Sequence, residues 1–132
     1  MRTSGLALVV SLGGLLLAIG TATANADEAS AVDRGRVKFQ RTCAPCHGAG
    51  PGNDGRAALP GTDALRLKYH GSLPALIEAR SDLTAEVLKA YVRRGSWSMP
   101  PFRKTELTDA EIKDIAAYLA VSSKAGANQP TR

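Results

Sequence analysis

Cys43-Ala44-Pro45-Cys46-His47 carries the strongest signal in this sequence, a C-x-x-C-H pattern. Two cysteines so close together would close a disulfide loop too short to stabilise the fold much. The pattern suits covalent attachment of haem, because two thiols at this spacing can form thioether bonds with the vinyl groups while the adjacent imidazole binds the iron. Cys43 and Cys46 are therefore the predicted attachment residues, and His47 is the predicted proximal ligand.

Two other readings of the cysteine pair remain open. A thioredoxin-like dithiol would need a strand-helix-strand context, and no strand pattern surrounds the motif. A structural zinc site would need four ligands, and the only other histidine is His70. The haem reading is the favoured one.

Met99 is the predicted sixth ligand of the iron. It is the only methionine besides Met1, and it stands in Trp97-Ser98-Met99-Pro100-Pro101-Phe102. The two prolines exclude helix and stiffen the segment, so that the thioether would be presented at little entropic cost. Met99 as a core filler and His70 as the ligand are the alternatives, although His70 follows a probable helix end, where turn residues are common.

The N-terminus has the features of a secretory signal. Residues 6–19 are almost continuously apolar, and Ala24-Asn25-Ala26 forms a small-residue cleavage site. The apolar run is shorter than the roughly 20 residues that span a bilayer. We expect cleavage after Ala26, a mature domain over 27–132 and no stable membrane insertion after processing, with an uncleaved anchor as the alternative.

Three main helices are predicted. One covers 31–42, one follows the Thr84 cap and stops at Gly95, and one begins at the Thr108 capping box closed by Glu111. Shorter helices are expected at 62–69 and 72–80, and a flexible tail at 122–132. With no strand pattern anywhere, the 132 residues predict one all-α domain.

The last predicted helix carries one apolar stripe. Ile112, Ile115, Ala116, Leu119 and Ala120 form it, with Tyr118 near its edge, whereas Lys113 and Asp114 are expected to face away. Gly35 lies inside the first predicted helix, where glycine costs about 1 kcal/mol relative to alanine. A close crossing with the last helix would explain that glycine.

The charge pattern argues against nucleic acid. The formal net charge is +5, but both signs alternate along the chain and no run of basic residues could neutralise many phosphates. A mildly acidic protein partner suits this surface better, and Arg103 and Lys104, just after Met99, are candidate contacts.

Over residues 31–121, the order of helix, C-x-x-C-H, Pro-flanked Met and final helix resembles class I cytochrome c. The resemblance implies an all-α fold around one covalent haem c, and a crossing of Gly35 and Phe39 against Tyr118. It also implies that a proline carbonyl accepts a hydrogen bond from the proximal imidazole. Pro60 is preferred for that role, and Pro51 is the alternative.

Residues 91–120, YVRRGSWSMPPFRKTELTDAEIKDIAAYLA, are similar to cytochrome subunits of p-cresol methylhydroxylase-type flavocytochromes. This resemblance implies a periplasmic one-electron carrier of a Gram-negative bacterium that accepts electrons from a flavoprotein oxidising alcohols or phenols. The alternatives are a shuttle between a quinol-oxidising complex and a terminal oxidase, and a haem enzyme or gas binder with an open iron site. The weaker pocket candidates are Pro60, Tyr69, Trp97, Pro100 and Phe102.

Overall fold

A computed structural model describes residues 19–127, which are mainly helical. The elements in chain order are α1 (Ile19–Thr42), α2 (Ala44–His47), α3 (Pro60–Tyr69), the 3₁₀ turn η1 (Ile77–Ala79), α4 (Ala85–Arg94) and α5 (Asp109–Ala127). Over this range no strand forms, and the only extended pairing is an isolated bridge between Ser96 and Met99. The predicted all-α class is confirmed.

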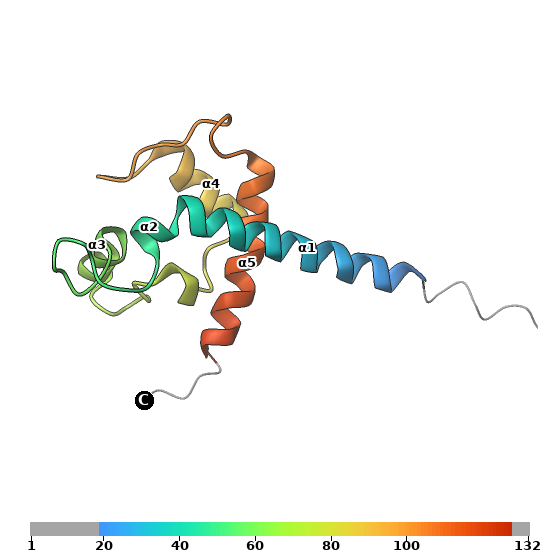
Figure 1. Cartoon of the computed structure of the whole chain (residues 1–132), viewed down its shortest axis with the longest axis horizontal. Coiled ribbons are helices and arrows are strands. Elements are labelled where there is room, and N and C mark those ends of the chain that lie inside the picture. Colours follow the sequence, from blue (N-terminus) through green and yellow to red (C-terminus); the bar gives the residue numbers. More distant parts are fainter. Residues whose placement is uncertain (1–18, 128–132) are drawn as a thin grey trace, which may run out of the picture.

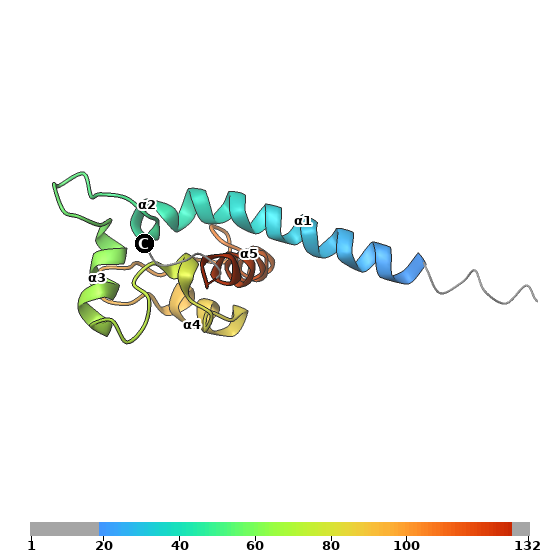
Figure 2. The ribbon, with the colours of Figure 1, turned by 90° about the horizontal axis from the view of Figure 1, so that it is seen from below.

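Two helices from opposite ends of the chain form the centre of the molecule. α5 runs across α1 (Figure 1), and from below α5 is seen nearly end-on while α1 is seen lengthwise (Figure 2). α4 packs beside α5, and α2 and α3 pack together at the C-terminal end of α1. The long arm of α1 extends away from this group.

Local capping residues set the starts of α4 and α5 as the sequence predicts. The hydroxyl of Thr84 accepts a hydrogen bond from the N–H of Val87 at 3.3 Å. At α5 the capping box is complete: the N–H of Glu111 donates to the Thr108 hydroxyl at 3.2 Å, and the N–H of Thr108 donates to Glu111 Oε2 at 2.7 Å.

Gly35 allows α1 and α5 to touch through their backbones. A Cβ atom at this position would lie 1.9 Å from the carbonyl oxygen of Asp114. No side chain, not even that of alanine, fits this space while the helices stay at their present distance. The expected close crossing at Gly35 is confirmed.

The hydrophobic core surrounds this crossing. The rings of Phe39 and Tyr118 lie with their centroids 5.4 Å apart and tilted by 47°, the aromatic contact that the resemblance implies. The buried apolar side chains are Phe39, Ile77, Val92, Leu107, Ile112, Ile115 and Leu119. Ala120 is exposed, although it was expected on the buried stripe. The buried stripe of α5 is narrower than predicted and consists of Ile112, Ile115 and Leu119.

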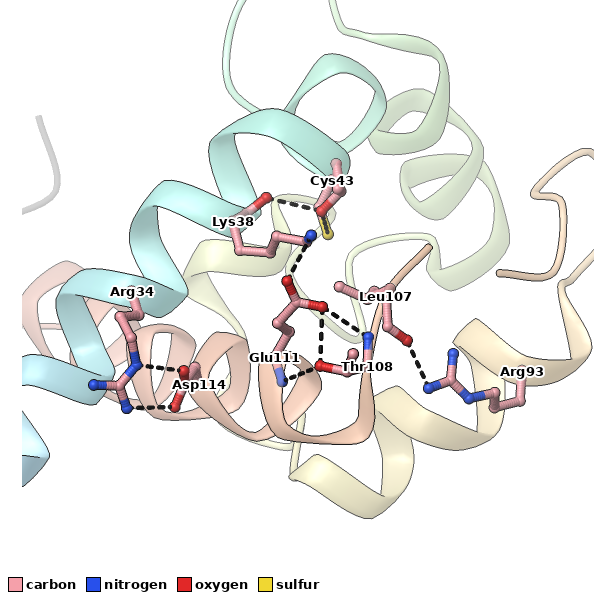
Figure 3. A network of polar contacts seen from close by, with 9 residues as sticks. Arg34, Lys38, Cys43, Arg93, Leu107, Thr108, Glu111 and Asp114 are labelled. Carbon is pink, nitrogen blue, oxygen red and sulfur yellow. Dashed lines mark hydrogen bonds and ion pairs between the residues drawn. The ribbon is translucent and has the colours of Figure 1, made fainter. Parts of the chain in front are cut away.

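Ion pairs lie on either side of Gly35 (Figure 3). Arg34 binds Asp114 through two nitrogens, at 2.8 and 3.1 Å, and Lys38 Nζ lies 2.7 Å from Glu111 Oε1. The contact with Lys38 is the largest cause that lowers the pKa of Glu111, to about 2. The expectation that Asp114 faces away from the buried stripe is wrong. The carbonyl of Asp114 lies against Gly35, and its carboxylate points towards Arg34 on α1.

Two boundaries of the main helices differ from the predicted ones. α1 begins at Ile19 rather than near residue 31, because the intervening residues are rich in alanine and contain no proline. α5 continues to Ala127, so residues 122–127 are helical rather than tail, and Ser123 is buried. Residues 128–132 and residues 1–18 of the signal peptide predicted at 1–26 lie outside the described residues, and cleavage after Ala26 stays a prediction.

The short helix expected at 72–80 is not formed. Only Ile77–Ala79 make a single 3₁₀ turn, with Leu76 extended before it and Arg80 extended after it. Pro74 explains the difference, because it disfavours helical backbone at Leu73 and has no N–H to donate. The other short helix begins two residues earlier than expected, at Pro60.

Replacing Gly35 by alanine tests the crossing. We expect Gly35→Ala to lower the free energy of unfolding by about 2 kcal/mol, because the new methyl group must push two backbones apart and overpacking outweighs the gain in helix propensity. Denaturant unfolding followed by circular dichroism measures this. Gly126→Ala is the control, since a Cβ there meets no atom within 4 Å. Equal stabilities of the two variants would contradict the close crossing.

Candidate haem-binding site

The C-x-x-C-H motif forms one helical turn at the end of α1. The N–H of Cys43 donates to the carbonyl of Phe39 at 2.8 Å, and the N–H of His47 donates to the carbonyl of Cys43 at 2.8 Å. Residues three and four apart lie on one face of such a turn. Cys43, Cys46 and His47 therefore share a face, and the position of the turn follows directly from that of α1.

The three side chains differ in burial. Both cysteines are free thiols; Cys46 is exposed, whereas Cys43 is partly buried beside the Thr42 hydroxyl. Burial raises the pKa of the Cys43 thiol and lowers the pKa of the His47 imidazole. Both groups are thus favoured in their neutral forms, and a neutral imidazole is the form that binds a metal.

The His47 imidazole packs against the start of α3. A Cβ at Gly61 would lie 2.7 Å from Cε1 and 2.8 Å from Nδ1 of His47, so only glycine permits this contact. Thr62 adds a second link by donating its hydroxyl hydrogen bond to the carbonyl of Gly48 at 3.0 Å. Helix α3 thus supports the imidazole from one side.

His47 Nδ1 is buried and has no hydrogen-bond partner among the described residues. Pro60 is the first residue of α3 and directly precedes Gly61, the residue that contacts the imidazole. The Pro60 carbonyl accepts no bond from Nδ1 here. Pro51 is exposed in the preceding loop and does not accept one either. The predicted proline contact therefore stays a prediction for both residues.

Met99 lies in a tight turn of the segment 95–108, which joins α4 to α5 and which we call the Met99 loop. The N–H of Ser96 donates to the carbonyl of Met99 at 3.0 Å, and the N–H of Met99 donates to that of Ser96 at 2.9 Å. Met99 is partly buried and packs against the hydrophobic core. The backbone of the turn is thus closed by a pair of reciprocal bonds.

Gly95 makes this turn possible. Its φ of 69° lies in the left-handed region, and a Cβ there would come within 2.6 Å of the Met99 carbonyl oxygen. The glycine predicted as the end of α4 therefore also forms the base on which the Met99 turn folds back.

The motif and the Met99 loop meet the same core. Cys43, Ala44, Met99 and Phe102 all pack against it. In Figures 1 and 2 the loop, in orange, projects to the end of the molecule that also holds α2 and α3. The predicted attachment residues and the predicted sixth ligand thus belong to one region, although the motif and Met99 lie far apart in sequence.

The weaker candidates are distributed unevenly. Phe102 is partly buried in the core, Pro100 is exposed, and Trp97 is fully exposed at the tip of the turn with a φ of 54°. The roles of these three as pocket walls stay predictions.

Tyr69 and His70 lie at the end of α3. The Arg80 guanidinium lies 4.8 Å from the centre of the Tyr69 ring, and its hydrogen bond is the largest cause that lowers the pKa of Tyr69. His70 is exposed at the end of α3 in a left-handed conformation, as expected of a turn residue. A pocket role for Tyr69 and iron ligation by His70 both stay predictions.

Sequence reasoning did not single out Gly61 or the interactions of Arg93. Gly61 is one of 13 glycines, and only its contact with His47 distinguishes it. Arg93 donates hydrogen bonds to the carbonyls of Phe102 and Leu107, the second of which is drawn in Figure 3. Its acceptors lie 9 and 14 residues away, so no local pattern signals them.

Known proteins resemble this chain in sequence. Residues 30–119 match the family described as Cytochrome C oxidase, cbb3-type, subunit III. Cytochrome c6 of Cyanidioschyzon merolae (strain NIES-3377 / 10D) is 30% identical over 92 residues, which cover 70% of this chain and 75% of the relative. No solved structure matches the chain.

The fold, the motif and these matches define a class I c-type cytochrome. Within that class the chain belongs to the cbb3-type subunit III cytochrome family, whose match spans the region from the middle of α1 into α5. It is an electron-transfer protein with covalently bound haem c, not an enzyme, and its partners are redox proteins. Among residues 19–127, no helix is both long and apolar enough to cross a membrane.

The donor set fits haem c. One helical turn presents two free thiols and an imidazole kept neutral by burial, and the separate Met99 loop presents a thioether. Nδ1 of His47 is a buried polar atom with no hydrogen-bond partner among the described residues, which is unusual for a histidine that only packs in a core. The residues present could therefore hold the group.

Replacing Gly61 tests the support of His47. We expect Gly61→Ala to displace the imidazole and to lower both the fraction of chain with attached haem and the free energy of unfolding, the latter by about 1–3 kcal/mol. Haem absorbance per mole of protein measures the attached fraction, and denaturant titration measures the free energy of unfolding. Ala64→Ser, at an exposed position of α3, is the control. Full haem loading and unchanged stability of Gly61→Ala would show that the contact is dispensable.

Proposed function

We propose that Cys43 and Cys46 hold the haem by thioether bonds and that His47 and Met99 occupy the two axial positions of its iron. The observation that carries this proposal is that the motif turn and Met99 pack against one core from two separate segments. Bound haem c supplies a one-electron couple. With both axial positions filled by the chain, the protein is a carrier rather than a binder of gases or peroxide.

The chain contributes positioning on each face. The His47 face is fixed by α2, which follows α1 after the single residue Cys43, and by the contact with Gly61. The Met99 face is fixed by the Ser96–Met99 bonds and by the two prolines that follow. Little reorganisation of the protein is then needed when an electron arrives or leaves, which suits fast transfer.

The proposal includes export of the protein and removal of its signal peptide. An A-x-A site before Asp27 and covalent haem attachment suit a protein processed after Ala26 and placed in the periplasm of a Gram-negative bacterium. A mature protein beginning at Asp27 would retain the helix residues that cross α5, since Gly35 and Phe39 lie well beyond the cleavage point. The alternative of an uncleaved anchor has the same core.

The proposed electron donor is a flavoprotein dehydrogenase that oxidises alcohols or phenols. Support comes from the likeness of residues 91–120 to the cytochrome subunits of such enzymes. Lys104 is exposed within the Met99 loop and could meet an acidic partner, whereas the neighbouring Arg103 is already paired with Glu106 at 2.9 Å. The family description favours a second candidate, a carrier that delivers electrons to a terminal oxidase.

Replacing Met99 tests the axial ligand. We expect Met99→Ala to open the sixth position, to change the ferric absorption spectrum and to lower the reduction potential by about 100 mV or more, because a thioether favours the reduced state. Absorption spectroscopy and redox titration measure this. His70→Ala is the control for the alternative ligand. A spectrum unchanged by Met99→Ala but altered by His70→Ala would overturn the proposed ligation.

Gentle purification of the mature protein from its native host tests the partner. If the chain is a subunit of a flavocytochrome, flavin should be released in a fixed ratio to haem. Flavin assay against haem absorbance measures this ratio. Haem without flavin would contradict a permanent flavoprotein complex and would favour the carrier to a terminal oxidase, whose partner is then sought by reduction kinetics.

A further inference from the structure

Arg93 forms an interaction network that the proposed function does not yet use. It lies in the last turn of α4, and its side chain is only 19% exposed. Nη1 donates to the carbonyl of Phe102 at 3.0 Å, while Nη2 donates to the carbonyl of Leu107 at 2.7 Å and to Asp109 Oδ1 at 2.6 Å. One guanidinium thus joins α4, two points of the Met99 loop and the start of α5.

Phe102 is held on both sides of its backbone. Its carbonyl accepts the bond from Arg93, and its N–H donates to the carbonyl of Val92 at 2.8 Å. Only Pro100 and Pro101 separate Phe102 from Met99, and their rings fix φ. A shift of Phe102 is therefore passed on to Met99 rather than absorbed between them.

The second carbonyl that Arg93 binds marks the end of the loop. Leu107 is almost completely buried in the core and directly precedes the capping box of α5 (Figure 3). Arg93 thereby fixes the distance between the Phe102 and Leu107 carbonyls. Because Nε is buried with no partner among the described residues, the orientation of the guanidinium depends on its two terminal nitrogens.

We propose that Arg93 is the positioning residue that holds the Met99 loop closed and so keeps the Met99 thioether in place as an iron ligand. This inference rests on the proposed ligation by Met99. A lysine could not replace Arg93, because a single ammonium lacks the planar fork that reaches both carbonyls and the carboxylate. Without Arg93 both carbonyls lose a charged donor, while Asp109 keeps Lys89, whose Nζ lies 2.7 Å from Oδ2.

Competition by imidazole tests this role in the ferric holoprotein. The readout is the absorption band that requires an iron–thioether bond, followed while free imidazole displaces Met99. We expect Arg93→Gln to lower the imidazole concentration at half-displacement about tenfold, the weakening that follows from loss of a charge-assisted hydrogen bond. Arg93→Lys should lower it as well, although it keeps the charge.

Two variants provide the controls. Arg94→Gln makes the same change of charge one residue further on, at an exposed side chain whose Nε contacts only the carbonyl of Ala90, at 3.3 Å. Leu119→Ala weakens the core at the α1–α5 crossing from a position on α5, outside the Met99 loop. In both variants the imidazole concentration at half-displacement should equal that of the parent protein. Leu119→Ala should nevertheless unfold at a lower denaturant concentration.

The outcomes separate the inference from the proposed function. If Met99→Ala abolishes the band but the Arg93 variants titrate like the parent, the ligation stands and the positioning role of Arg93 is overturned. A similar shift in Leu119→Ala would also overturn it, because the loop would then only follow global stability. If Met99→Ala keeps the band, both proposals fail together.

Discussion

The backbone contact between α1 and α5 at Gly35 is the constraint on which the remaining structure depends. Because no Cβ separates the helices there, Phe39 can reach Tyr118, and both become part of the buried core or pack against it. Only Cys43 separates α1 from α2, the helix that ends at His47, and α5 begins where the Met99 loop ends. One crossing therefore sets the positions of both halves of the candidate site.

The charged residues around the crossing contribute geometry more than stability. Arg34 is 58% exposed, so its pair with Asp114 is screened and adds little to the free energy of folding. Glu111 has a double role, since it closes the capping box through Thr108 and also binds Lys38 on α1. A single carboxylate thus fixes where α5 begins and how α5 is oriented on α1.

Features with a local cause could be predicted from the sequence, and features with a distant cause could not. The Thr84 cap, the Thr108 capping box, the Gly35 crossing and the all-α class depend on residues a few positions apart or on one conspicuous glycine. Pro74 prevents the helix predicted at 72–80, and the flanking segments extend α1 and α5 beyond their apolar stripes. The acceptors of Arg93 lie up to 16 residues away, and the contact of Gly61 with His47 joins two helices. Such pairings depend on tertiary packing alone.

The two faces of the candidate site are held by interactions of different kinds. On the His47 side, the short helix α2 follows α1 after one residue and packs against α3, so the imidazole can move only if one of these helices moves. On the Met99 side, a loop is held at its carbonyls by one guanidinium and at its base by Gly95. Breaking a few bonds opens a loop, whereas displacing a helix disrupts the core. Under the proposed ligation, the Met99 thioether is therefore the ligand that a competitor would displace first, and the contacts of the loop rather than the core set how readily this occurs.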